Sequence, residues 1–440
     1  MKGENGKMKS DIEQREIEVP YELPEGWKWC RLGELAKFER GITFPASAKE
    51  KEKNENNIPC LRTANVQENI ELEDLIYVNK SFMKNNIKKL IQNNDIVFSS
   101  ANSRELVGKS AFISNVSFPM TFGGFILCIR ATNSNSKFLF YFLRLHFLLG
   151  RFMGKSTQTT NIANINTETL SNIIIPLPPT LAEQQRIVNR IESMFAKLDE
   201  AKEKAQNVLD GFETRKAAIL HKAFTGELTA KWRKENGVSD DSWVEKLFDS
   251  CIAKMQNGLS KRSGNEGEET VVLRLANMGE DDFDVSDLRT IKLTSKEKNN
   301  YSLAKNDVVM IRVNGSKTNV GRQLLVKNNK GWSFCDHIIR IQFETFCLPN
   351  YMVYFSKTKE YIDYVQDNMV SSAGQNTISR KGLSNLSLKV PTLPEQVEIV
   401  RILDIIIEKE TRAKEAAQTV LDQIALLKKS ILARAFRGEL

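Results

Sequence analysis

The residue types that could catalyse a reaction or hold a metal are present in this chain of 440 residues, but their spacings do not support such chemistry. The three histidines, His146, His221 and His337, are scattered along the chain. The six cysteines show neither a C-x-x-C spacing nor a paired histidine, so neither a zinc site nor a disulfide framework is indicated. Leu177-Pro178-Pro179-Thr180 does not match the Asn/Asp-Pro-Pro-Tyr/Phe motif of amino-methyltransferases. We therefore expect no catalytic residue and no metal site.

One segment approaches a nucleotide-binding motif without reaching it. Gly150-Arg-Phe-Met-Gly154-Lys155-Ser156 resembles a phosphate loop, but three residues rather than four separate its glycines. It also follows an apolar, helix-like run at residues 138–149 instead of a strand. The sequence therefore predicts no cofactor in this chain and favours a binding protein over an enzyme.

Polar side chains that gather in loops suit the recognition of DNA. Arg and Lys can bind guanine edges or phosphates, and Asn or Gln can form paired hydrogen bonds with adenine. The excess of 63 Lys+Arg over 55 Asp+Glu gives a net charge of +8, which favours a polyanionic partner. Polar loops can equally be solvated turns, so the hypothesis concerns the loops more than any single residue. The candidates are Arg62, Asn65, Ser100, Asn102, Arg104, Lys155, Gln158 and Thr160 in the first half, and Arg274, Asn277, Arg312, Asn314, Ser316, Lys317, Gln375 and Asn376 in the second.

These two sets occupy matching places because the chain contains an internal repeat. A shift of 212 residues aligns residues 183–228 with residues 395–440, and about 20 of the 46 positions are identical. The match continues in less similar parts, where Leu61-Arg62-x-Ala64-Asn65 aligns with Leu273-Arg274-x-Ala276-Asn277. The sequence predicts a tandem duplication of one unit, a variable module followed by a well-matched helix.

Both matched segments carry the pattern of long helices that pack lengthwise. Apolar residues recur at alternating spacings of four and three, the heptad seam of a coiled coil. Thr180-Leu-Ala-Glu183 and Thr392-Leu-Pro-Glu395 have the form of capping boxes, and Gly226 and Gly438 stand where C-terminal caps are expected. At 1.5 Å per residue each helix would be roughly 60 Å long. The residues expected to pair or to dock a partner are Ile187, Ile191, Leu198, Ala205, Phe212, Ile219, Ile399, Leu403, Ile406, Ala417, Ile424 and Ile431, with Ala413, Val420 and Leu427 as further seam positions.

The helices have two interpretations. An antiparallel coiled coil that only stiffens the protein explains the seam. The identities outside the seam favour partner docking as well, and two equivalent helices would bind two copies of one partner.

The fold class expected is α+β: two tandem mixed α/β modules separated by two long helices that pack as an antiparallel coiled coil with pseudo-twofold symmetry. Strands are predicted at residues 95–98, 125–129, 173–175 and 307–311. Residues 1–20 lack an apolar signal segment and no apolar run is long enough to span a bilayer, which predicts a cytoplasmic protein. The predicted order is an N-terminal extension (1–20), a first recognition module (21–180), a spacer helix (181–228), a linker (229–235), a second recognition module (236–392) and a second spacer helix (393–440).

This layout resembles the specificity subunit of type I restriction–modification systems over nearly the whole chain. The second copy departs from the pattern, because Asp241-Ser242-Trp243 lacks the Pro-Glu-Gly and Lys389-Val390-Pro391 replaces a fuller proline run. The residues that carry the resemblance are Leu23-Pro24-Glu25-Gly26-Trp27 before Leu32-Gly33-Glu34-Leu35, Ile175-Pro176-Leu177-Pro178-Pro179 with Glu183-Gln184-Gln185-Arg186-Ile187, and the Ala-Phe-x-Gly-Glu-Leu ends at 223–228 and 435–440.

The resemblance implies a non-catalytic subunit with two target recognition domains, each of which recognises half of a split site in double-stranded DNA. The helices would set the length of the gap between the halves. It also implies two methyltransferase subunits, which bind S-adenosylmethionine and methylate a flipped-out adenine at N6, and motor–nuclease subunits. S-adenosylmethionine, ATP and Mg²⁺ are therefore expected in the partners.

Three alternatives remain at this stage. The chain could be a stand-alone DNA-binding protein that works without a methyltransferase, or a coiled-coil scaffold whose modules bind protein. The third alternative is an enzyme without a recognisable motif, which the missing spacings disfavour.

Overall fold

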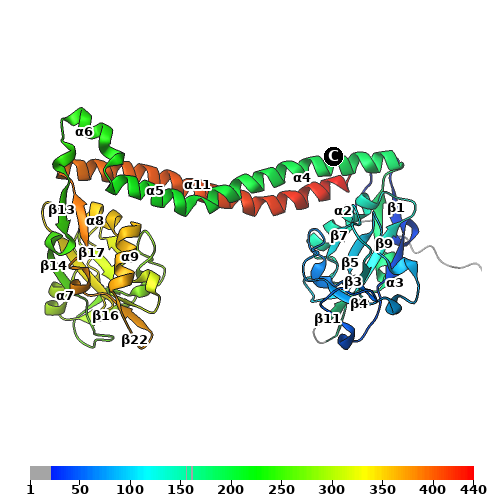
Figure 1. Ribbon diagram of the computed structural model, residues 1–440, viewed down its shortest axis with the longest axis horizontal. Coiled ribbons are helices and arrows are strands. Elements are labelled where there is room, and N and C mark those ends of the chain that lie inside the picture. The colour runs from blue at the N-terminus through cyan, green and yellow to red at the C-terminus, as the bar shows by residue number, and fades with distance from the viewer. Residues whose placement is uncertain (1–20, 155, 160–161) are drawn as a thin grey trace, which may run out of the picture. The chain divides into compact units, whose positions relative to one another are not determined.

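The computed structural model describes residues 21–154, 156–159 and 162–440, so the extension expected at residues 1–20 lies outside the described residues. The chain forms two compact units. Unit 1 comprises Met1–Lys204 and Thr419–Leu440, and unit 2 comprises Ala205–Gln418. Each unit contains one module and a part of both long helical segments (Figure 1).

The described residues of the module in unit 1 form small sheets rather than one large sheet. The main sheet is antiparallel, and the helix α2 packs against it through a core rich in phenylalanine. The sheets, in strand order, are β2 (Ala36–Arg40), β9 (Ile126–Ala131), β5 (Ile96–Ser99) and β7 (Ser110–Phe112); β4 (Ile76–Asn79), β3 (Asn57–Leu61) and β8 (Thr121–Phe122); β10 (Thr157–Thr159), β11 (Ile162–Asn164) and β6 (Ala101–Asn102); and β1 (Lys28–Arg31) with β12 (Ile174–Leu177). The helices are α1 (Leu32–Leu35), α2 (Ser136–Leu148) and α3 (Thr167–Ser171).

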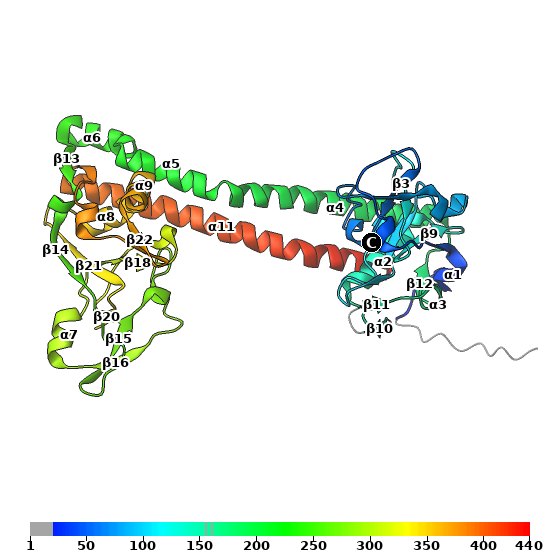
Figure 2. The same cartoon turned by 60° about the horizontal axis from the view of Figure 1, so that its bottom comes forward.

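The module in unit 2 repeats this strand order. The main sheet again packs against a helix, α8, which is visible in Figure 2. The sheets are β14 (Ile252–Asn257), β21 (Ile338–Phe343), β17 (Val308–Ile311) and β19 (Gln323–Leu325); β16 (Thr290–Leu293), β15 (Glu268–Leu273) and β20 (Ser333–Phe334); β18 (Val313–Asn314), β23 (Gln375–Thr377) and β22 (Val370–Ser372); and β13 (Val244–Leu247) with β24 (Ser387–Val390). The helices are α7 (Ser295–Tyr301), α8 (Pro349–Phe355), α9 (Lys359–Asn368) and α10 (Arg380–Leu383).

The central strand of each main sheet lies between two hydrophobic cores. In β5, Ile96 and Phe98 join the core under α2, whereas Val97 points into a second core with Leu61 and Phe122. Because both faces of the strand are buried, Ile96, Val97 and Phe98 form a continuous apolar run instead of an alternating pattern, and Ser99 ends the strand. The strands expected at 95–98, 125–129, 173–175 and 307–311 are β5, β9, β12 and β17, to within two residues at each end.

The two long helical segments differ in continuity. The second is one helix, α11 (Leu393–Ala435), but the first is interrupted at Gly211 between α4 (Leu181–Asp210) and α5 (Phe212–Phe224). Glycine weakens a helix interior by about 1 kcal/mol relative to alanine, and the second copy has Gln423 at this position. The Arg215 side chain folds over the break and donates a hydrogen bond to the Val208 carbonyl at 2.9 Å. The prediction of two equally continuous helices was therefore wrong at Gly211.

The helix ends also differ between the copies. At the start of α4 the Glu183 N–H donates to the Thr180 hydroxyl at 3.1 Å, as a capping box requires, but the Glu183 carboxylate accepts from Arg186 instead of closing the box. The Glu395 carboxylate points away from the start of α11 into a buried hydrogen-bond network, so the second capping box was wrong. Gly226 (φ +83°) and Gly438 (φ +75°) adopt the left-handed conformation expected after the helices.

Most of the expected seam is buried. In unit 1 the early part of α4 and the last turns of α11 share a core, which includes Ile191 and Leu432, and in unit 2 Leu220 of α5 shares one with Leu403 of α11. The seam prediction was wrong at Ala413, Val420 and Leu427, which are exposed. The expected seam residues that are buried are Ile187, Ile191, Ala205, Phe212, Ile399, Leu403, Ala417, Ile424 and Ile431, while Leu198, Ile219 and Ile406 are half-buried.

Three further expectations concern the whole chain. The segment predicted as a linker at 229–235 contains most of a short helix, α6 (Ala230–Asn236), which follows a 3₁₀ turn at Glu227–Thr229. All six cysteines belong to the described part of the chain, are buried and form no disulfide. No helix in the described ranges combines the length and the hydropathy that crossing a bilayer requires.

Candidate DNA interface

The two matched Arg-x-x-Asn turns, Arg62–Asn65 and Arg274–Asn277, stabilise the fold. The Asn65 side-chain oxygen accepts from the Arg62 N–H at 2.9 Å, and its amide donates to the carbonyls of Glu71 and Glu73 at 3.1 Å each. Asn277 makes the equivalent bonds in the second module. Both asparagines are buried and hydrogen-bonded within the module, so we withdraw them as DNA-contacting candidates.

The arginines of these turns also bind the fold, although they are only half-buried. A guanidinium N–H of Arg62 donates to the Asp74 carbonyl at 2.6 Å. The corresponding group of Arg274 donates to both the carbonyl and the carboxylate of Asp287, at 2.9 Å each. Each guanidinium is thus anchored to the module through one Nη group and stays partly exposed.

The loop that follows β5 has a buried start and an exposed tip. The Ser100 hydroxyl is buried and donates to the Phe125 carbonyl at 3.0 Å, which excludes Ser100 as a DNA contact. Asn102 is half-buried and its side-chain oxygen accepts from the Ser103 N–H at 2.9 Å. Arg104 is exposed. Lys155, Thr160 and the side chain of Gln158 lie outside the described residues.

The corresponding loop of unit 2 is held by the hairpin of β22 and β23. The Asn376 amide is buried and donates to the carbonyl of Gly315 at 2.9 Å, and its oxygen accepts from the Ser371 hydroxyl at 2.6 Å, so Asn376 is also withdrawn as a DNA contact. The loop and the hairpin present polar side chains to solvent around this bond. Ser316, Lys317 and Gln375 are exposed, and Arg312 and Asn314 are half-buried.

A cleft of about 540 Å³ opens on the module of unit 1, where the segment after β2 meets residues 123–126. Its described lining residues include three cations, Arg40, Lys49 and Arg62, and no carboxylate. Two aromatic rings, Phe44 and Phe125, also line it, and Phe125 is 57% exposed. A concave surface with charge of one sign concentrates ligands of the opposite sign, so this cleft suits a polyanion.

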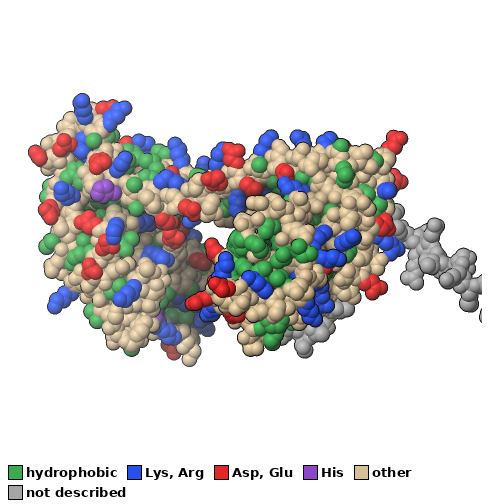
Figure 3. Space-filling view, turned by 45° about the vertical axis from the view of Figure 1, so that its right-hand side comes forward, with side chains coloured by type: hydrophobic (Ala, Val, Ile, Leu, Met, Phe, Trp, Pro, Cys, Tyr) green, Lys and Arg blue, Asp and Glu red, His purple; other side chains and the backbone are tan. Residues whose placement is uncertain are grey.

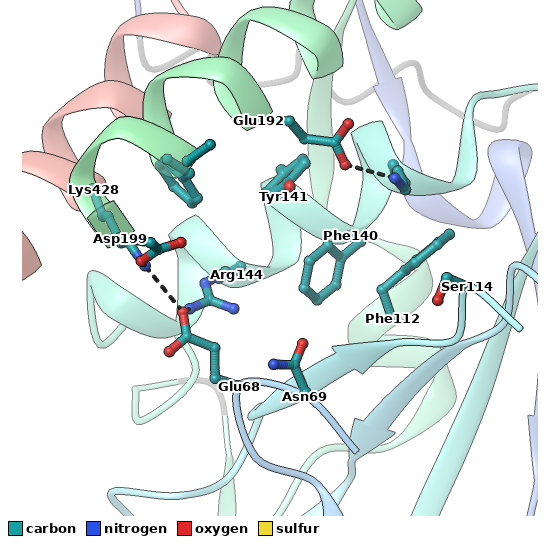
Figure 4. A pocket seen from close by; sticks show the side chains of 13 residues that line it. Glu68, Asn69, Phe112, Ser114, Phe140, Tyr141, Arg144, Glu192, Asp199 and Lys428 are labelled. Carbon is teal, nitrogen blue, oxygen red and sulfur yellow. Dashed lines mark hydrogen bonds and ion pairs between the residues drawn. The ribbon is translucent and has the colours of Figure 1, made fainter. Parts of the chain in front are cut away.

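A second pocket has a different character. It has a volume of about 530 Å³ and lies where the module of unit 1 meets the helices (Figure 4). Lys428 of α11 lies 2.7 Å from Asp199 of α4 and 3.4 Å from Glu68 of the module, and Arg144 of α2 also pairs with Glu68. Burial opposes ionisation of Glu68, but the two cations outweigh it and hold its pKa below the usual value. We call this ionic contact the module–helix junction; its balanced charges do not suit a polyanion.

Figure 3 shows the surface of the first module, where hydrophobic side chains gather beneath the helices with charged groups of both signs around them.

Unit 2 has its own module–helix junction. Lys216 of α5, which aligns with Lys428, lies 3.6 Å from Asp281, and Lys357, in the turn between α8 and α9, lies 2.5 Å from the same carboxylate. Burial again opposes ionisation of Asp281, yet the two lysines lower its pKa. Each module is therefore tied to a helix by the same kind of contact.

Within the described ranges, Cys335, Asp336 and His337 form a group of side chains that could hold a metal ion. Burial raises the pKa of the Cys335 thiol, and Asp336 pairs with Arg262 at 2.8 Å. A metal requires the thiolate, so both features disfavour a metal at this position.

Comparison with known proteins matches this duplicated architecture. The family model described as "Type I restriction modification DNA specificity domain" matches residues 24–209 and again residues 251–421. The chain belongs to this family. This specificity subunit is 32% identical to the type I restriction enzyme StySPI specificity subunit of Salmonella potsdam, over 95% of this chain and 90% of that protein. It is 29% identical to the EcoKI specificity subunit of Escherichia coli K12, with the same coverage of both chains.

Solved structures agree in fold. The crystal structure of the HsdS subunit from Thermoanaerobacter tengcongensis matches with a TM-score of 0.63 and 19% identity, over 96% of this specificity subunit and 99% of that chain. A chain from a structure of the assembly and conformational transition of a type I restriction–modification system matches with a TM-score of 0.66, also at 19% identity, over 96% and 100% of the two chains.

Two kinds of residue in this specificity subunit escaped the sequence reasoning. Lys216 and Lys428 are identical in the repeat and occupy buried or nearly buried positions beside the seam, so their identity was a signal that could have been used. Phe125 lay inside a predicted strand, and no sequence pattern indicated that it would precede β9 and be exposed.

Proposed function

We propose that this chain is the DNA-recognition subunit of a type I restriction–modification complex, in which each module recognises one half of a bipartite double-stranded site. The observation that carries the proposal is that two modules with the same strand order present different side chains on matching loops. One frame with two different surfaces is suited to two different half-sites. The cationic cleft of unit 1 supports DNA as the ligand.

The helices, in this proposal, pack as an antiparallel coiled coil with pseudo-twofold symmetry and set the gap between the half-sites. The support lies within each unit, where the start of one helical segment packs on the end of the other. The proposed boundaries are recognition domains at 21–180 and 236–392 and spacer helices at 181–228 and 393–440. When two modules that each bind DNA weakly are joined, the second module binds its half-site intramolecularly. Their sequence selectivities therefore multiply when the gap between the half-sites matches the spacer.

We further propose that two methyltransferase subunits dock on the matched helices and that motor–nuclease subunits join them. S-adenosylmethionine, ATP and Mg²⁺ would bind to these partners. This chain would recognise the DNA sequence and would not itself catalyse a reaction. The complex would act in the cytoplasm. Exposed apolar side chains on α11, such as Val397 at 54% and Leu426 at 67%, support a protein partner on the helices.

The decisive experiment is long-read methylation mapping in a host that carries this chain with its cognate methyltransferase. We expect methylated adenines in two half-sites separated by a fixed gap. Insertion of one helical turn after Ala205 should change the gap length and leave both half-sites unchanged, because it lengthens the spacer without altering a module. Altered half-sites with an unchanged gap would contradict the proposal.

Two outcomes would favour the alternatives. A chain that purifies without a methyltransferase yet binds a specific sequence would be a stand-alone reader. A chain whose DNA affinity is absent, or does not fall with salt, would be an interaction scaffold, because phosphate contacts make DNA binding salt-dependent.

A further inference from the structure

Both modules contain the same tight turn between two consecutive strands, β8 and β9 in unit 1 and β20 and β21 in unit 2. In unit 1 the turn is residues 123–125, and in unit 2 it is residues 335–337. Each is closed by a matching hydrogen bond of 2.9 Å, from the Ile126 N–H to the Gly123 carbonyl and from the Ile338 N–H to the Cys335 carbonyl. We call these two segments the recognition turns.

Each recognition turn lies directly against a glycine, Gly41 after β2 in unit 1 and Gly258 after β14 in unit 2. A Cβ atom on Gly41 would lie 2.1 Å from the carbonyl oxygen of Gly123, and a Cβ on Gly258 would lie 2.1 Å from that of Cys335. No larger residue fits at either place without movement of the backbone. The frame around the two turns is therefore the same in both modules.

The turns also hold the loops that carry surviving DNA candidates. The Phe125 carbonyl accepts from the Ser100 N–H at 2.9 Å, and the His337 carbonyl accepts from the Arg312 N–H at 2.8 Å. In each module the recognition turn therefore lies next to the polar loop, and the two contacts occupy matching positions of the repeat. Arg104 lies farther along the first loop and Lys317 along the second.

On this common frame the side chains differ. Phe125 stands where His337 stands in the other module, and it is 57% exposed at the rim of a cleft lined by three cations. A large ring that is mostly exposed contributes little to the stability of the fold, because little of its apolar surface is buried. An aromatic face can contact a thymine methyl group or an unstacked base, whereas an imidazole can exchange hydrogen bonds with a base edge or a phosphate.

We propose that the recognition turns contact DNA and that Phe125 and His337 help to make the two half-sites different. The inference rests on the proposed function, since it assumes one module per half-site. It adds a location and one named side chain within each module. The ligand is duplex DNA, which the cationic lining of the cleft around Arg62 favours over a protein.

The test is a pair of substitutions that control for each other. Phe125→Ala and His337→Ala are introduced separately into the chain, which is co-expressed with its methyltransferase for methylation mapping. Each variant is expected to relax the base preference at one position of one half-site on the order of tenfold, and the two variants should affect different halves. The gap and the untouched half-site should stay as in the wild type.

Exchange variants guard against loss of folding. Phe125→His and His337→Phe keep a ring at each turn, and their thermal unfolding should match that of the wild type while the preferred base changes. The inference is overturned if both half-sites keep their sequence in methylating complexes, or if Phe125→Ala weakens co-purification of the methyltransferase with unchanged half-sites. Absence of any bipartite methylation in the wild type would instead refute the proposed function.

Discussion

Glu183 and Glu395 are the same residue at matching positions of the repeat, yet the structure predicts very different costs for their removal. Glu395 is fully buried, and one of its carboxylate oxygens accepts from the Thr229 hydroxyl at 2.7 Å, from Arg233 at 2.7 Å and from the Trp243 indole at 3.1 Å. Glu183 lies on the surface and pairs with Arg186 three residues along the same helix.

The magnitude follows from what each substitution leaves behind. Glu395→Ala removes the buried partner of Arg233, whose side chain is 9% exposed and whose other carboxylate partner, Asp240, is 88% exposed. Removing one partner of a buried ion pair costs about 3–5 kcal/mol. Glu183→Ala removes a surface pair near a helix N-terminus, which costs at most about 1 kcal/mol. Glu395→Gln keeps an acceptor oxygen and should cost about 1–2 kcal/mol.

Hydrogen exchange followed by mass spectrometry measures these costs in each unit separately. We expect Glu395→Ala to accelerate exchange in the slowest amides of residues 205–418 by roughly a hundredfold to several thousandfold, since 1.4 kcal/mol corresponds to tenfold. Amides of residues 21–204 should be unchanged. Glu183→Ala is the matched control and should change exchange in unit 1 by less than about tenfold. Equal effects of the two substitutions would refute the assignment of Glu395 to a buried network.

Three further predictions concern the turns and the junctions. Asn65→Ala and Asn277→Ala should each destabilise their own module by about 1–3 kcal/mol, because three backbone groups lose the buried side chain that bonds them, and should leave both half-sites unchanged; hydrogen exchange and methylation mapping measure the two effects. Lys428→Met and Glu68→Gln, combined in a double-mutant cycle, should show a coupling of about 0.5–1 kcal/mol that shrinks in high salt, and a coupling insensitive to salt would exclude an ionic contact. The folded-state pKa of Asp281 is lowered, so the stability it contributes is present above its ordinary value of 3.8 and is lost as the pH falls through the lowered pKa. Asp281→Asn should flatten the acid unfolding curve in that range, and an unchanged curve would count against the junction.

The long helical segments and four of the strands could be predicted because their apolar residues follow patterns that the sequence displays. Strand β5 is apolar on both faces, and the helical segments repeat an apolar spacing over many turns. The interruption at Gly211 was visible as a single glycine, but no pattern in the sequence showed that Arg215 would fold over it. A helix boundary that depends on the contacts of one side chain cannot be predicted from the periodicity of the apolar residues.

The candidate site was predicted less well, because a polar residue in a loop has two possible partners. Asn65 and Asn277 are repeated in both modules since both modules need the same turn, and a residue shared by two readers of different sequences is more useful to the frame than to recognition. Side chains that differ on matching turns, such as Phe125 and His337, carry more information about specificity. Their exposure depends on tertiary contacts that the linear sequence does not display.

The strand that separates two cores in each module also limits how such a protein can diversify. Successive side chains of β5 and β17 point into opposite cores, so a substitution at almost any position disturbs one core or the other and these strands tolerate little change. The turns and loops leave both cores untouched, which lets short surface segments be exchanged without refolding of the domain. A new DNA specificity can therefore arise from substitutions of a few residues in surface turns and loops, while the hydrophobic cores stay unchanged.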